Sequence, residues 1–160
     1  VVSPQNPFKQ SAGLLNEYQR LHLARLATEE DPRIKASDIE FALPKPSYTV
    51  NTLAYLTEKY PEHKFSVIMG SDSFQNLDKW KNHEVIIRDH KIYVYNRPGF
   101  EITDRFGADI EVLDAPLLDI SATAIRKMIR DGRSVRYLLT EKVLEEIEKA
   151  GYYRQADQKK

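Results

Sequence analysis

Residues 65–70 read F-S-V-I-M-G, and this stretch decides the fold. Phe65, Val67, Ile68 and Met69 form a compact apolar run, and Gly70 ends it. A short apolar run of this kind is typical of a strand that is covered on both faces inside a parallel sheet. We therefore expect a buried strand here, with a loop at its carboxyl end that begins at Gly70.

Helices and strands alternate on either side of this run. Apolar periodicity and capping residues predict helices near residues 14–29, 50–56, 84–89, 121–131 and 140–151. Further strands are expected at residues 1–2, 34–43, 92–95 and 110–113. This order predicts an α/β fold, a Rossmann-like open parallel sheet with helices on both faces. We expect one domain over residues 1–153 and a polar tail over residues 154–160.

Composition narrows the classes of partner. Lys and Arg together number 24, as do Asp and Glu, so the formal net charge is zero. Nucleic-acid and anionic-membrane binders usually carry a basic excess, so neither a nucleic acid nor a membrane is an expected partner. The sequence leaves the oligomeric state open, and a homo-oligomer is compatible with it.

Residue types that commonly bind metals or form cross-links are scarce. The chain has no cysteine, which excludes disulfides and cysteine-based zinc sites and fits a cytoplasmic protein. The four histidines show no metal-ligand spacing, so no protein-held metal site is expected; they are His22, His63, His83 and His90. The apolar runs are a few residues long, far short of a membrane span.

Five segments follow the expected strands and hold most of the unusual polar and small residues. They are residues 3–9, 45–49, 70–74, 96–99 and 114–121. Parallel strands end at the same edge of a sheet, and ligands of open α/β folds bind there. We therefore expect all five segments to lie along one rim.

Residues 119–126, D-I-S-A-T-A-I-R, combine a helix start with hydroxyls and a cation. The unpaired N–H groups of a helix start favour phosphate. Ser121 and Thr123 add hydroxyls, and Arg126 supplies a forked cation one turn further on. An ordinary capped helix with a surface arginine is the alternative, and from position alone it is the more common case.

The other rim segments also allow two interpretations. Gly70 permits close approach of a ligand, and Asp72 offers a carboxylate to ribose hydroxyls or merely caps a turn. Trp80, the only tryptophan, is either a stacking platform for an aromatic ring or a half-buried surface anchor. Arg97 either meets phosphate or braces the rim.

In order along the chain, these segments resemble the motifs of the nicotinate-mononucleotide adenylyltransferases of the nucleotidyltransferase superfamily. The matching runs are P-x-x-P-x-K at residues 4–9, P-S-Y-T at 46–49, G-x-D-S at 70–73 with Trp80, R-P-G at 97–99, and I-S-x-T-x-I-R at 120–126. Phe8 stands where the first of these motifs often has histidine. Gly151-Tyr152-Tyr153 also looks like the carboxyl terminus of this family.

The resemblance implies a role for each matching residue. ATP would be bound by Lys9, Gly70, Asp72, Ser121, Thr123 and Arg126, and Arg126 would also act in catalysis. The mononucleotide would be bound by Ser47, Tyr48, Thr49, Trp80, Lys81 and Arg97, with its pyridine ring stacked on Trp80.

The implied reaction joins ATP to nicotinate mononucleotide and forms nicotinate adenine dinucleotide and pyrophosphate, a step of NAD biosynthesis. Mg²⁺ would enter with ATP, held largely by phosphate oxygens and water. Two alternatives stay open from the sequence. One is an adenylyltransferase of the same fold that acts on nicotinamide mononucleotide or phosphopantetheine, and the other is a non-catalytic nucleotide-binding module.

One family motif has no counterpart in these 160 residues. Members of the superfamily carry G-x-F-x-P-x-H-x-G-H between their first strand and first helix, and its histidines meet the ATP phosphates. We expect the natural protein to have an upstream segment with this first strand and helix. The chain without that motif is expected to be inactive.

Overall fold

The computed structural model describes residues 1–8, 13–116 and 120–154. The chain divides into two compact units, one formed by Val1–Pro46 with Ile120–Lys160 and the other by Ser47–Asp119. Each unit has its own apolar core, and each is described by itself. None of the helices in the described ranges is both long and apolar enough to cross a membrane.

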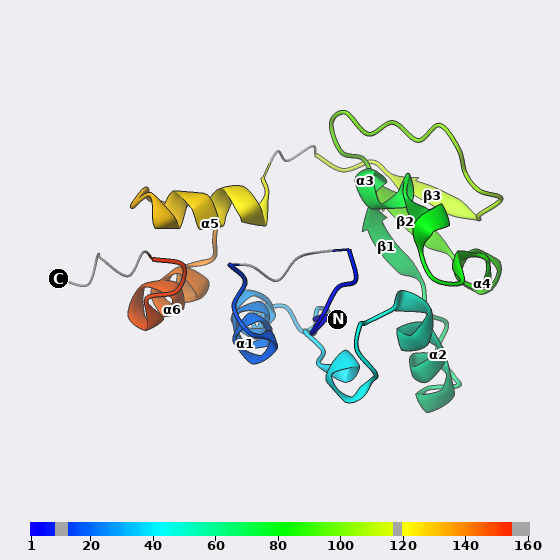
Figure 1. Ribbon diagram of the computed structural model, residues 1–160, viewed down its shortest axis with the longest axis horizontal. Helices are drawn as coiled ribbons and strands as arrows, with labels where there is room; N and C mark the ends of the chain where they lie inside the picture. The colour runs from blue at the N-terminus through cyan, green and yellow to red at the C-terminus, as the bar shows by residue number, and fades with distance from the viewer. Residues whose placement is uncertain (9–12, 117–119, 155–160) are drawn as a thin grey trace. The chain divides into compact units, whose positions relative to one another are not determined.

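The unit formed by Ser47–Asp119 is built on a parallel sheet (Figure 1). Its strands β1 (Val67–Gly70), β2 (Ile92–Tyr95) and β3 (Ile110–Leu113) pair in the order β1-β2-β3. Helices join or flank them: α2 (Thr49–Lys59), α3 (Ser71–Phe74), the 3-10 turn η2 (Leu77–Lys79) and α4 (His83–Asp89). The predicted α/β class, the parallel pairing and these three strands are confirmed.

Alternate strand residues build the core of this unit. Val67, Ile92 and Ile110 are partners in register across the three strands. Two residues further along, on the same face, Met69 pairs with Val94. The helices add the rest of the buried cluster, namely Val50, Leu53, Phe74, Leu77 and Ile86. Because α3 follows β1 without a gap, burial of Phe74 fixes the turn in which the polar side chains of Ser71 and Asp72 lie.

The opposite face of the strands differs from the prediction. Ile68 points away from this cluster and is 72% exposed, and its neighbours in register are the half-buried Tyr93 and the exposed Glu111. The apolar run at residues 65–69 predicted cover on both faces, whereas the helices of the unit Ser47–Asp119 cover one. An apolar run indicates a strand but does not show which faces its neighbours cover.

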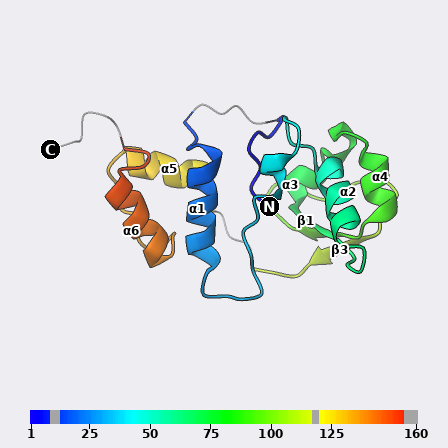
Figure 2. The same cartoon turned by 90° about the horizontal axis from the view of Figure 1, so that it is seen from below.

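The second unit packs helices together. It contains α1 (Glu17–Thr28), the 3-10 turn η1 (Ile39–Ala42), α5 (Ala122–Arg130) and α6 (Glu141–Ala150). Figures 1 and 2 both show α1, α5 and α6 side by side. Their contact is apolar, with a buried centre of Ile129, Val135, Val143 and Ile147 that the α1 residues Leu23 and Leu26 also touch.

Local signals explain where these helices begin and end. Asn16 and Gln19 form a reciprocal capping box at the start of α1. Gly151 ends α6 with a φ of 68°, a left-handed conformation that glycine adopts without steric cost. Thr140 precedes α6 as predicted, although its side chain makes no capping hydrogen bond.

Two predicted strands are wrong. Within residues 34–43 the backbone forms the turn η1, where Phe41 N–H donates to Asp38 and Leu43 N–H to Glu40. Phe41 meets Tyr18 edge-to-face, with ring centroids 5.2 Å apart. The partial alternation of apolar residues in this stretch therefore reflects packing of a turn and not of a strand. Residues 1–2 are not in a strand; Val2 N–H donates to Ser37 in a single backbone hydrogen bond.

Candidate functional site

The carboxyl ends of β1 and β2 bring two predicted site residues together. Arg97 follows β2, and its Nε lies 3.5 Å from Oδ1 of Asp72, which follows β1. The backbone N–H of Arg97 donates to Oγ of Ser71 over 2.9 Å, and Ser71 is fully buried. A partly buried hydrogen bond therefore joins the two strand ends beside a partly exposed ion pair.

Gly70 leaves room for this ion pair. A Cβ at Gly70 would lie 2.4 Å from Asp72 Oδ1 and 3.1 Å from Arg97 Nε, both closer than normal contact. The backbone of Gly70 is extended, with φ −74°, so its conformation suits any residue. The glycine is needed here because two charged side chains fold over it.

Two aromatic residues and a cation of the predicted site lie in the same unit. Tyr48 and Trp80 are both half-buried and pack against the core cluster. The backbone N–H of Trp80 donates to Leu77 over 2.9 Å, which anchors the turn that carries the indole. Nζ of the exposed Lys81 lies over the Tyr48 ring, 4.5 Å from its centroid. This contact joins the predicted P-S-Y-T segment to the segment that contains Trp80.

The remaining residues of the P-S-Y-T segment lie at the start of α2. Tyr48 is the N-cap and Thr49 the first helical residue, and no side chain caps this end. Oγ of Ser47 is buried and has no hydrogen-bond partner among the described residues. A helix start without a side-chain cap retains unpaired N–H donors and a partial positive charge.

The start of α5 has the features expected for phosphate binding. Ser121 is its N-cap, and its Oγ accepts from the N–H of Ala124 over 3.1 Å. One turn on, the Arg126 guanidinium donates to Oγ1 of Thr123, also over 3.1 Å. Hydroxyls, helix-start N–H groups and a guanidinium therefore share the first turn and a half of one helix. The predicted cap Asp119 lies outside the described residues.

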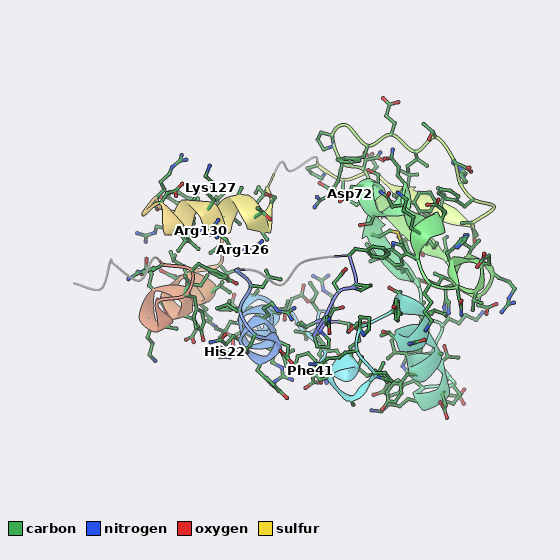
Figure 3. All side chains as sticks on the ribbon, in the orientation of Figure 1. His22, Phe41, Asp72, Arg126, Lys127 and Arg130 are labelled. Atoms are coloured by element: carbon green, nitrogen blue, oxygen red, sulfur yellow. The ribbon has the colours of Figure 1, made fainter. Side chains whose placement is uncertain are left out.

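Arg126 and its neighbour Lys127 differ in their surroundings. Figure 3 shows Arg126 and Arg130 on one side of α5 and Lys127 on the other. Arg126 is half-buried and close to Tyr153, whereas Lys127 is exposed. Burial raises the pKa of Tyr153, and the positive charges of Arg126 and Arg20 oppose that rise because they favour the phenolate.

The predicted site residues thus fall into two groups. Asp72 contacts Arg97 over Gly70, and Lys81 contacts Tyr48, all within Ser47–Asp119. Ser121, Thr123 and Arg126 lie together on α5 in the other unit. Lys9 lies outside the described residues. Ser71 was not predicted as a site residue, because a serine in a loop is common. Only the folded structure shows that its hydroxyl accepts from the N–H of Arg97.

The described residues contain no group of three or more His, Cys, Asp or Glu that could hold a metal ion. The histidines instead make other contacts. His90 Nδ1 lies 3.0 Å from the Phe65 carbonyl oxygen, and His22 Nε2 lies 3.4 Å from a Glu146 carboxylate oxygen. Asp72 is the carboxylate beside Gly70, and it is engaged by Arg97.

These features define a nucleotide-binding α/β fold, and comparison with known proteins identifies its family. The chain belongs to the cytidylyltransferase-like family, which residues 1–128 match. It is similar to a protein of Flavobacterium johnsoniae named probable nicotinate-nucleotide adenylyltransferase, with 48% identity over 157 residues. A Flavobacterium psychrophilum protein of the same name is 46% identical over 157 residues. Each alignment covers 96% of this chain and 81% of the relative.

A solved structure shares the fold at much lower sequence identity. The Plasmodium falciparum nicotinic acid mononucleotide adenylyltransferase complexed with NaAD superposes with a TM-score of 0.74 at 17% identity. The match covers 94% of this chain and 79% of that one. At this identity the likeness confirms the fold, the predicted Rossmann-like class.

Proposed function

We infer that this chain serves in transfer of the adenylyl group of ATP to nicotinate mononucleotide, the reaction that gives nicotinate adenine dinucleotide and pyrophosphate. The observation that carries this function is the 46–48% identity, over 96% of the chain, to relatives named for that activity. Two features of the structure support it. One is the ion pair of Asp72 and Arg97 at the ends of β1 and β2, and the other is the start of α5, where hydroxyls and a guanidinium suited to phosphate lie together. The lack of cysteine fits action in the reducing cytoplasm.

In the reaction, a phosphate oxygen of the mononucleotide attacks the α-phosphorus of ATP. The new P–O bond forms as the bond from the α-phosphorus to the bridging oxygen breaks, and pyrophosphate leaves with that oxygen. No protein nucleophile is needed, so the chain contributes alignment and neutralisation of the charge on the leaving group. We assign that neutralisation to Arg126, helped by Ser121, Thr123 and the free N–H groups at the start of α5.

We assign the other residues by their chemistry. Asp72 accepts from ribose hydroxyls of ATP beside Gly70, and Lys9 adds a cation for phosphate. Trp80 stacks on the pyridine ring, Ser47, Tyr48 and Thr49 hold the mononucleotide at the start of α2, and Arg97 meets its phosphate. Mg²⁺ would come with ATP, held largely by phosphate oxygens and water, and would supply neutralisation of phosphate charge.

Pyrophosphate release tests this function. Protein whose amino terminus has been verified by intact mass is mixed with ATP and Mg²⁺ and with nicotinate mononucleotide, nicotinamide mononucleotide or phosphopantetheine in turn. We expect the highest kcat/KM with nicotinate mononucleotide. ATP binding without release of pyrophosphate with any acceptor, in protein proven to be full-length, would instead identify a non-catalytic nucleotide-binding module.

Trp80→Ala should mainly raise the KM for nicotinate mononucleotide, by about tenfold or more, because stacking of a base on an aromatic ring contributes about 1–3 kcal/mol. Trp80→Phe keeps a ring, so its KM for nicotinate mononucleotide should lie between those of Trp80→Ala and the wild type. Steady-state kinetics with each substrate varied measures the effect. A rise confined to the KM for ATP would contradict the assignment of Trp80.

Gly70→Ala should weaken ATP binding by about tenfold, since the added Cβ displaces the Asp72 carboxylate from its position beside Arg97. The loss of stability should stay below about 1.5 kcal/mol, because the crowded atoms are side-chain ends that can move. Titration calorimetry with ATP and thermal denaturation separate the two effects. Asp72→Asn is the matched variant that removes the charge without added bulk, and unchanged ATP affinity in both variants would exclude this role.

A further inference from the structure

Lys81 is held by an aromatic ring rather than by a carboxylate, as is Lys59, whose Nζ lies 5.6 Å from the centroids of Tyr55 and Tyr60. Nζ of Lys45 lies 2.8 Å from Glu17, and Nζ of Lys91 lies 2.7 Å from Glu111, so a carboxylate neutralises each. Nζ of Lys81 lies instead over the Tyr48 ring, 4.5 Å from the centroid, and no carboxylate among the described residues pairs with it. An aromatic face positions an ammonium without cancelling its charge. The ammonium of Lys81 is therefore held in place and keeps N–H groups that can donate to an anion.

The surroundings of Lys81 favour an anion attached to a flat ring. Tyr48 is the N-cap of α2, whose start has no side-chain cap, so the partial positive charge of the helix end lies beside the same tyrosine. Trp80 precedes Lys81 directly and presents a half-buried indole to stack on. A ring stacked on Trp80 with a negatively charged substituent would therefore meet a cation one residue along the chain.

We propose that Lys81 is a specificity-determining residue that pairs with the ring carboxylate of nicotinate mononucleotide, and that Tyr48 holds its ammonium in position. This inference rests on the proposed function. It assigns the preference for nicotinate over nicotinamide to a side-chain charge in addition to main-chain donors. A carboxamide at the same place carries no charge, so it gains no ion pair with Lys81.

Nicotinate mononucleotide carries a second anion, its phosphate, and the experiment separates the two. Nicotinamide mononucleotide has the same phosphate and lacks only the carboxylate. We therefore compare kcat/KM for both mononucleotides, and their calorimetric Kd values, in wild type and in Lys81→Gln. Loss of one charge-assisted contact should lower the nicotinate-to-nicotinamide preference by about tenfold, with nicotinamide mononucleotide little affected.

Four further variants sharpen the test. Lys81→Arg keeps the charge and the contact with the ring, so it should restore most of the preference. Tyr48→Leu removes the ring and should lower the preference as Lys81→Gln does, whereas Tyr48→Phe should retain it. Lys79→Gln is the matched control, because Lys79 is also exposed and its Nζ donates to Asn76, 2.6 Å away. Added salt should reduce the preference in wild type but not in Lys81→Gln.

The outcomes distinguish this inference from the proposed function. An equal loss with both mononucleotides in Lys81→Gln would mean that Lys81 meets the phosphate or only braces Tyr48, and would overturn the inference. An unchanged ratio would overturn it as well. Wild-type protein that uses neither mononucleotide would overturn the proposed function and this inference with it. A loss confined to nicotinate mononucleotide, with rescue by arginine, would establish it.

Discussion

Replacing Arg126 with alanine is expected to lower kcat by about 10²–10³-fold, the usual effect of removing one preorganised donor from developing charge. The KM for nicotinate mononucleotide should change little, because Arg126 is assigned to the pyrophosphate that leaves. Arg126 is half-buried on α5 and donates to Thr123, so its guanidinium is already held at the helix start. Steady-state kinetics with both substrates varied checks this result.

Lys127→Ala is the matched control for Arg126→Ala. It removes the adjacent positive charge from the exposed, opposite side of α5 and should leave kcat near the wild-type value (Figure 3). The pKa of Tyr153 gives a second measurement that does not depend on activity. Without Arg126 that pKa should rise further, because a charge that favours the phenolate is lost. A KM effect on the mononucleotide with kcat intact would refute the role of Arg126.

Phe74→Ala should cost about 3–5 kcal/mol of stability, the usual cost of removing a buried phenylalanine side chain. Phe74 is fully buried and meets Phe106 edge-to-face, with centroids 5.7 Å apart. Because α3 carries Asp72 on the turn that Phe74 anchors, activity should fall at temperatures where β1 and α3 begin to open. Thermal denaturation measures the stability, and hydrogen exchange of the β1 and β2 amides locates the change.

Tyr137→Ala is the surface control for Phe74→Ala. Tyr137 is 95% exposed, and its loss should alter stability by less than about 0.5 kcal/mol. A similar loss of stability in the two variants would mean that burial of Phe74 does not determine the stability of the unit Ser47–Asp119.

Much of the fold could be predicted because its signals are local. The strands Ile92–Tyr95 and Ile110–Leu113 occupy the expected residues, and Ser121 caps α5 as its sequence indicates. Gly151 ends α6 in the left-handed conformation that makes glycine a good helix stop. Each of these signals acts within a few residues, so a sequence reveals it without the rest of the chain.

The errors arose where distant contacts decide the conformation. Residues 39–42 alternate weakly, and their turn is stabilised by a hydrogen bond from Ser3 Oγ to Glu40, 2.6 Å long. The exposure of Ile68 depends on which helices pack on each face of the sheet. In the candidate site, residue types were identifiable from motifs, but the contacts of Asp72 with Arg97 and of Lys81 with Tyr48 were not. They join residues 25 and 33 positions apart, respectively.

The contact between Asp72 and Arg97 has a consequence for how each substrate affects the binding of the other. The two side chains are assigned to different substrates, yet in the free protein each engages the other. A ribose hydroxyl that donates to Asp72 weakens its hold on Arg97 and releases the guanidinium for the phosphate of the mononucleotide. The substrates should then bind with positive cooperativity, each raising the affinity of the protein for the other by the same factor.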